Sequence, residues 1–132
     1  MTNVLEIELF KNLCDWDLER NNHRDLHSDF GCNGIEFAQQ SLHLKFQGLA
    51  KSSHKLEIEF MNVEVVRMDI SFDEPLANLT LDSLYRGRFE IDGGLVEFDE
   101  RGRGYFYLEF YEGPELEFWS KSVSMDDTDA VL

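Results

Sequence analysis

The chain has 132 residues, and its 27 Asp and Glu against 12 Lys and Arg give a formal net charge of −15. Such a charge repels nucleic acid and anionic membranes, which excludes both as expected partners and leaves a basic surface as the best complement. A hydrophobic content of 42% and an aromatic content of 13% exclude a disordered acidic chain, and the length predicts one domain over 1–132.

The first predicted element is a strand over residues 4–10. Leu5, Ile7 and Leu9 alternate there with polar or charged residues, and a period of two indicates a half-buried strand. The next stretch, 11–34, is mostly polar. We expect it to form a long loop with a turn or two of helix.

Alternation of period two then continues along the middle of the chain. It predicts strands around 35–37, 42–46, 56–60 and 66–72. Pro75 follows the last of these and ends it, because proline removes a donor from the strand ladder. For 76–84 the leucine spacing leaves two interpretations open, a short helical turn or an irregular loop.

The C-terminal third predicts an antiparallel meander. Its strands cover 86–92, 95–99, 105–112 and 115–123, and the first turn is a two-residue hairpin at Gly93-Gly94. We expect the acidic tail, 124–132, to fray. The whole pattern predicts a mainly β, single-domain antiparallel sandwich or partly open barrel of about eight strands, with at most one or two short helices.

Cysteine usage and the N-terminal segment bear on the compartment. Cys14 and Cys32 show neither CxxC nor zinc-type spacing, and we predict free thiols. A disulfide would require their Cα atoms to lie within about 7 Å. No basic start followed by an apolar run is present, and no apolar run reaches the roughly 18 residues needed to span a bilayer. We therefore expect a cytoplasmic protein.

No motif identifies an enzymatic activity. The sequence lacks GxSxG, a Walker-type loop and a GxGxxG between strand and helix. The segment Gly102-Arg103-Gly104 lies between two predicted strands and is interpreted as a turn. We predict a protein that is not an enzyme and that needs no cofactor.

The nearest approach to a metal site is the pair His23 and His27. Both would share one face if this run were helical, with His43 or His54 as a third ligand. The Glu of HExxH is missing, and polar loop histidines are the simpler interpretation. We predict no metal site.

The last four predicted strands separate into two faces. One phase is apolar and forms the expected core: Phe89, Ile91, Val96, Phe98, Phe106, Leu108, Phe110, Leu116 and Phe118. The opposite phase mixes acids with aromatic residues that should face water. The candidate partner-binding residues on it are Glu97, Asp99, Tyr105, Tyr107, Glu109, Tyr111, Glu117 and Trp119.

Composition favours a contact surface on this half of the chain. Residues 67–132 carry 16 acids and 6 bases, a net charge of −10, whereas 1–66 carry 11 acids and 6 bases, a net charge of −5. Protein interfaces are enriched in Tyr and Trp, and the surrounding carboxylates would attract a basic partner. Two alternatives stay open: the aromatic residues could cover a second core or form cross-strand pairs, or the partner could bind 11–34.

A resemblance extends over residues 26–63. The polar run Leu26-His27-Ser28-Asp29-Phe30 leads into three amphipathic segments, Gly34-Ile35-Glu36-Phe37, Leu42-His43-Leu44-Lys45-Phe46 and Leu56-Glu57-Ile58-Glu59-Phe60-Met61-Asn62-Val63. This pattern resembles small, acidic, β-rich bacterial immunity proteins of toxin–immunity pairs, of the contact-dependent growth inhibition type. The resemblance implies a cytoplasmic heterodimer with one basic protein toxin, often a nuclease. It transfers no functional residue by position.

We therefore expect a binding protein that neutralises a cognate basic toxin by covering its active site or groove. The tyrosines and Trp119 would supply desolvated anchors, and the acids the complementary charge. Two alternatives are a phage-type DNA mimic that inhibits a nuclease and a β-barrel that binds small apolar ligands. Large apolar residues on the inward phase predict a filled interior, which disfavours the barrel.

Overall fold

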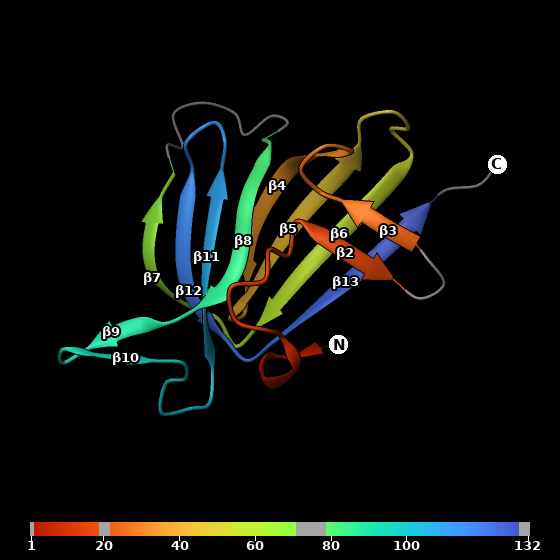
Figure 1. Ribbon diagram of the computed structural model, residues 1–132. Helices are drawn as coiled ribbons and strands as arrows, with labels where there is room; N and C mark the ends of the chain where they lie inside the picture. Colours follow the sequence, from red (N-terminus) through yellow and green to blue (C-terminus); the bar gives the residue numbers. More distant parts are fainter. Residues whose placement is uncertain (1, 19–21, 71–78, 130–132) are drawn as a thin grey trace.

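The computed structural model describes residues 2–18, 22–70 and 79–129 (Figure 1). Its two larger antiparallel sheets form an open sandwich that does not close into a barrel, so the predicted sandwich is confirmed. The helical content of the described part is a single 3-10 turn, η1 (Val4–Glu6). No helix among these residues has the length and apolar character that crossing a membrane requires.

The strands fall into two larger sheets and two hairpins. The first sheet has the spatial order β1 (Thr2–Asn3), β13 (Ser122–Asp129), β6 (His54–Met61), β5 (Ser41–Gly48) and β4 (Phe30–Ala38). The second has the order β7 (Glu64–Asp69), β12 (Glu115–Ser120), β11 (Gly104–Phe110) and β8 (Leu81–Gly87). The hairpins are β2 (Asp15–Leu18) with β3 (Asn22–Asp25), and β9 (Phe89–Ile91) with β10 (Gly94–Val96).

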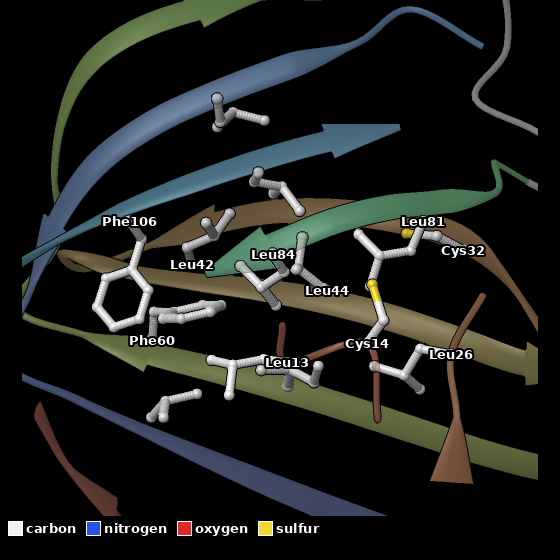
Figure 2. Close-up of a cluster of buried hydrophobic side chains, with 14 of the residues drawn as sticks. Leu13, Cys14, Leu26, Cys32, Leu42, Leu44, Phe60, Leu81, Leu84 and Phe106 are labelled. Carbon is white, nitrogen blue, oxygen red and sulfur yellow. The ribbon is translucent and has the colours of Figure 1, made fainter. Parts of the chain in front are cut away.

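The core lies between the two larger sheets. Phe60 of β6 packs against Phe106 of β11 and Phe118 of β12, with ring centroids 5.2 and 4.9 Å apart, and all three side chains are fully buried. Figure 2 shows Leu42 and Leu44 of β5 gathered with Leu84 of β8 around this contact. The strands predicted at 42–46, 56–60 and 105–112 are confirmed, because their alternation matches this one buried face.

Two pairs of strands pass from one sheet to the other at a bend. β6 continues into β7 through Asn62, and β12 continues into β13 through Lys121, whose N–H donates to the carbonyl of Met61 at 3.0 Å. Asn62 takes the left-handed conformation that the bend requires, with φ at 53°. The buried guanidinium of Arg103 donates to the Asn62 carbonyl at 3.4 Å and to Glu64 at 2.8 Å, which ties the bend to the chain before β11.

The predicted strand over 4–10 is wrong, because a capped turn replaces it. The Asn3 side chain accepts from the Leu5 N–H, and the Glu6 carboxylate accepts from the Asn3 N–H, which completes a capping box. The turn buries Val4 and leaves Leu5 71% exposed. Local hydrogen bonding therefore overrides the alternating pattern.

The predicted loop over 11–34 contains the hairpin β2–β3 and the start of β4. The Leu13 N–H donates to the carbonyl of Leu84, and the Leu26 N–H donates to that of Cys14, so backbone bonds fix this segment. The run that carries His23 is a strand rather than a helix, and the shared helical face considered for a metal site does not form.

Two further segments differ from the sequence prediction. Residues 124–129 are not frayed but continue β13, which pairs with β6 over its whole length, whereas 130–132 lie outside the described residues. Residues 81–84 belong to β8, so neither the helical turn nor the irregular loop is correct there; 76–78 lie outside the description. In both cases long-range strand pairing decides a conformation that the local sequence does not encode.

The first turn of the C-terminal meander is shifted by one residue from its predicted position. Gly94 pairs with Ile91, which places the two-residue turn at Asp92-Gly93 instead of Gly93-Gly94. Asp92 and Gly93 have φ of 51° and 80°, the positive values that a type I′ turn needs at both central positions.

The contact between Gly104 and Val4 yields a test of this packing. A methyl group at Gly104 would collide with Cγ2 of Val4, so we expect Gly104→Ala to lower the free energy of unfolding by about 1–3 kcal/mol. Gly94→Ala is the matched control, since nothing lies closer than 3.7 Å to its added methyl; its effect should stay within about 0.5 kcal/mol. Urea unfolding followed by tryptophan fluorescence measures both, and equal effects would contradict the packing described.

Candidate functional site

The candidate surface is the outer face of the four-stranded sheet. The register of β11 with β12 sets Tyr105 beside Trp119, Tyr107 beside Glu117 and Glu109 beside Glu115. The residues between them, such as Phe106 and Phe118, are buried in the core between the two sheets. The three pairs therefore point away from the core, to the outer face of the sheet. The structure therefore brings together five of the eight candidate residues: Tyr105, Tyr107, Glu109, Glu117 and Trp119.

Two of these aromatic residues are buried instead of exposed. Tyr105 is 0% exposed and Trp119 is 5% exposed, because Phe89 of the hairpin β9–β10 packs on both rings at centroid distances of 4.6 and 5.5 Å. The prediction that they are exposed anchors is wrong. Figure 1 shows β9 and β10 leaving the sheet as a separate hairpin. Phe89 continues the outward phase of Tyr85 and Gly87, which pair with Tyr107 and Tyr105, so its predicted place in the main core is wrong. The second-core alternative is correct for Tyr105 and Trp119.

A second aromatic pair lies beside the first. Tyr107 stacks on Tyr85 of β8 with ring centroids 5.1 Å apart and planes inclined by 15°. Its hydroxyl donates to the Arg88 carbonyl at 2.8 Å, and Gly87 leaves room for its ring, since a methyl there would lie 2.7 Å from it. Burial and the charges of Glu109 and Glu117 raise the pKa of Tyr85. Tyr85 was not among the sequence candidates, because it precedes the strand predicted over 86–92; its pairing with Tyr107 places it on the outer face.

Glu117 lies at the centre of the polar contacts on this face. It accepts from the Tyr105 hydroxyl at 3.0 Å and from Arg67 of β7 at 2.9 Å. Arg67 also forms an ion pair with Glu115 at 2.8 Å. The hydrogen bond with Glu117 and the charge of Glu115 raise the pKa of Arg67, while burial and the hydrogen bond to Glu117 raise that of Tyr105.

Carboxylates outnumber cations on this side of the sheet. The register of β7 with β12 places Glu64, Arg67 and Asp69 on the outer face beside the residues already described. We call the resulting surface the acidic face and define it by the acids Glu64, Asp69, Glu109, Glu115 and Glu117 with the tyrosine Tyr107. We add Tyr111, which continues the outward alternation of Tyr107 and Glu109 one residue beyond β11. Tyr111 follows β11 directly and is 78% exposed, which makes it the most accessible aromatic ring of this surface. Carboxylates beside phenol rings bind Lys and Arg side chains through ion pairs and cation–π contacts.

Glu97 and Asp99 do not belong to the acidic face. Both lie between β10 and β11, where Glu97 accepts from the buried Arg86 at 3.4 Å and Asp99 accepts from the side chain of Arg103 at 2.6 Å. Burial alone would raise the pKa of Asp99, but hydrogen bonds from the Arg103 backbone and side chain bring it below its usual value. The contacts of Glu97 and Asp99 thus hold a loop, and the strand register does not place these two candidates beside the other acids.

The described histidines are engaged at separate places. His27 contacts the Leu81 carbonyl at 2.7 Å, His43 contacts Glu57 at 2.7 Å, and His54 contacts Asp127 at 2.6 Å. Within the described ranges, no three His, Cys, Asp or Glu side chains gather as a metal site requires. The side chain of His23 lies outside the description.

Both cysteines are buried and free, and neither belongs to the surface. Burial raises the pKa of the Cys14 and Cys32 thiols to about 12, so neither is a nucleophile near neutral pH.

Comparison of the chain with known protein families and with curated proteins finds no match.

Aromatic variants separate the buried pair from the exposed ring. We expect Trp119→Ala to lower the free energy of unfolding by about 3–5 kcal/mol, because it empties the space under Phe89. Tyr111→Ala should change it by less than about 0.5 kcal/mol, since its ring is exposed. Chemical denaturation measures both values. A small effect of Trp119→Ala would contradict the burial of this ring.

The Asp99–Arg103 contact predicts a pH-dependent loss of stability. Because the pKa of Asp99 is lower in the folded protein than in the unfolded chain, its contribution is full above the unfolded value, 3.8, and disappears as the pH falls through the folded value. We expect Asp99→Asn to destabilise the protein by about 1–3 kcal/mol at pH 7. The difference from the wild type should shrink steadily below about pH 4. A difference that does not depend on pH would contradict this role of the carboxylate.

Proposed function

We propose that this protein is a non-enzymatic binding protein that neutralises a cognate basic toxin by covering the toxin's active site or groove. The observation that carries the proposal is the excess of carboxylates on the acidic face: its five acids are accompanied by two cations, Arg67 of β7 and Arg103, which bonds Glu64 from just before β11. Such a surface attracts a basic partner and speeds its encounter.

The buried and exposed aromatic residues have different roles in this proposal. Tyr111 and the half-buried Tyr107 supply the contact area, because interfaces use tyrosine as a large anchor with little side-chain entropy to lose. Tyr105 and Trp119 pack against Phe89, and this packing makes rigid the sheet that carries Tyr107 and Tyr111. The proposed binding residues are therefore Tyr107, Tyr111, Glu109 and Glu117, joined by Asp69.

A bacterial toxin is the proposed partner for two reasons. The run over 26–63 resembles small acidic immunity proteins, and the net charge of −15 fits a strongly basic protein such as a nuclease. Two buried, free thiols accord with a reducing, cytoplasmic setting. We propose a heterodimer in which the acidic face lies over the basic groove of the toxin.

Recovery of the partner from the native cell tests this function. An affinity-tagged copy of the chain should retain one basic protein in a stoichiometric complex that salt weakens. Expression of that protein alone should arrest growth, and co-expression of this chain should restore it. A captured protein whose expression leaves growth unchanged would contradict neutralisation of a toxin, and a restriction or RNA-guided nuclease would favour the DNA-mimic alternative.

Charge reversal on the acidic face predicts a specific loss of affinity. The double variant Asp69→Lys/Glu109→Lys should weaken the complex about a hundredfold, mostly through a slower association rate. The control Glu8→Lys/Asp126→Lys changes the net charge equally at two exposed positions elsewhere and should cost less than about tenfold. Surface plasmon resonance at several salt concentrations measures both. Equal losses in the two variants would contradict a localised binding face.

A further inference from the structure

Most edges of the two larger sheets carry a backbone neighbour. On β8 the Phe10 N–H donates to the carbonyl of Arg86 at 2.8 Å, and an N–H from the same N-terminal segment donates to Leu84. On β4, Cys32 and Leu79 exchange two backbone hydrogen bonds of 2.7 and 2.8 Å, which cover the first part of this edge; among the described residues, 34–38 have no further backbone neighbour. β1 pairs with the beginning of β13. The remaining edge of β13 is acidic, which protects it from unspecific pairing.

β7 differs from these edges in being uncovered along its whole length. It pairs with β12 on one side, and among the described residues its backbone makes no hydrogen bond on the other side. All six of its residues, Glu64–Asp69, are exposed. A row of unpaired N–H and C=O groups is a template onto which another strand can be added.

The side chains of β7 do little to block such an addition. The strand contains neither Lys nor Pro, and its charged residues are one Arg and two acids, so its protection is selective against acidic strands and not against basic ones. Val65, Val66 and Met68 are 38, 46 and 46% exposed. The register shifts between Arg67 and Val65, so Val66 forms a bulge, and this irregularity limits pairing with arbitrary strands.

The two sides of β7 specify what an added strand would carry. Met68 pairs with Leu116 and Val65 pairs with Phe118. Because Leu116 and Phe118 are fully buried, Met68 and Val65 lie at the open rim of the core. On the other side, Glu64 and Asp69 belong to the acidic face. An added strand would therefore be apolar toward the core and basic toward the acidic face.

Charge argues against a second copy of this chain as the occupant. An antiparallel self-pairing centred between Val66 and Arg67 would set Glu64 opposite Asp69 in both halves. It would also bring together two bodies that each carry a net charge of −15. The complementary occupant is an extended segment of another protein with alternating basic and apolar residues.

We propose that the partner docks by adding such a segment to the edge of β7, so that the four-stranded sheet continues into the partner. This inference rests on the proposed function, because it takes the partner to be the basic protein that the acidic face attracts. It adds the mode of recognition: backbone hydrogen bonds to β7 give affinity, and alternation of basic with apolar side chains gives specificity.

A synthetic peptide tests this mode independently of the partner's identity. The probe is a fluorescent seven-residue peptide of alternating lysine and valine, titrated into the whole chain at low salt. Its matched control has the same sequence with alternate amides N-methylated, which keeps every charge and removes the donors along one edge. Two N-methylated versions, one for each edge, cover both orientations.

The expected result is binding of the unmodified peptide and a loss of about tenfold or more for one N-methylated version. Amide hydrogen exchange should slow at residues 64–69 on binding. Equal affinity of all three peptides would overturn strand addition and leave the acidic face as a charge-only binding site. Absence of binding at low salt for every peptide would overturn both proposals.

A pair of protein variants separates the effect of an added charge from an effect at the edge of β7. Met68→Asp and Leu49→Asp each replace an exposed apolar residue by the same charge, the first on β7 and the second in the loop after β5. Strand addition predicts that Met68→Asp weakens peptide binding at least about fivefold although the added charge attracts lysine. Leu49→Asp should leave binding unchanged or slightly tighter. A matching response of both variants would overturn the role of β7.

Discussion

The packing of Phe60 between Phe106 and Phe118 is the contact on which the rest of the structure depends. It joins β6 of one sheet to β11 and β12 of the other through fully buried rings. Because side chains of a strand alternate between two faces, fixing Phe106 and Phe118 inward sends Tyr105, Tyr107, Glu117 and Trp119 outward. The outer surface of the four-stranded sheet, and with it the proposed function, is thus a consequence of the core.

The hairpin β9–β10 then divides that outer surface into two parts with different roles. Phe89 covers Tyr105 and Trp119 near one end of β11 and β12, which creates a small second core. Towards the other end the tyrosines give way to Glu109 and Glu115, which no second layer of the described chain covers. One sheet face therefore combines rigidity with an open carboxylate surface, the combination that rigid docking to a basic partner requires.

The sequence predicts those parts of the structure in which alternation and burial agree. Residues 42–46 and 56–60 have one apolar and one polar side and lie in the sheet as expected. Prediction failed where partners distant in sequence decide: β13 carries Asp126 and Asp127 and is ordered by β6, by an ion pair of Asp127 with Arg24 and by a hydrogen bond of Asp127 with His54. It also failed at Phe89, because hydrophobicity assigned this residue to the main core, whereas it continues the outward phase of Tyr85 and Gly87 and packs on Tyr105. The sequence therefore predicted which candidate residues of β11 and β12 share one face, but gave the wrong exposure for Tyr105 and Trp119.

Hydrogen exchange of the whole chain, free and bound to the protein it retains in its native cell, tests the central claim most directly. If the acidic face and the edge of β7 form the interface, amides of 64–69 and 107–117 exchange more slowly in the complex, while those of β4 and β5 are unchanged. Protection confined to 11–34, or to the outer face of the five-stranded sheet, with β7 and β12 unaffected, would contradict the account.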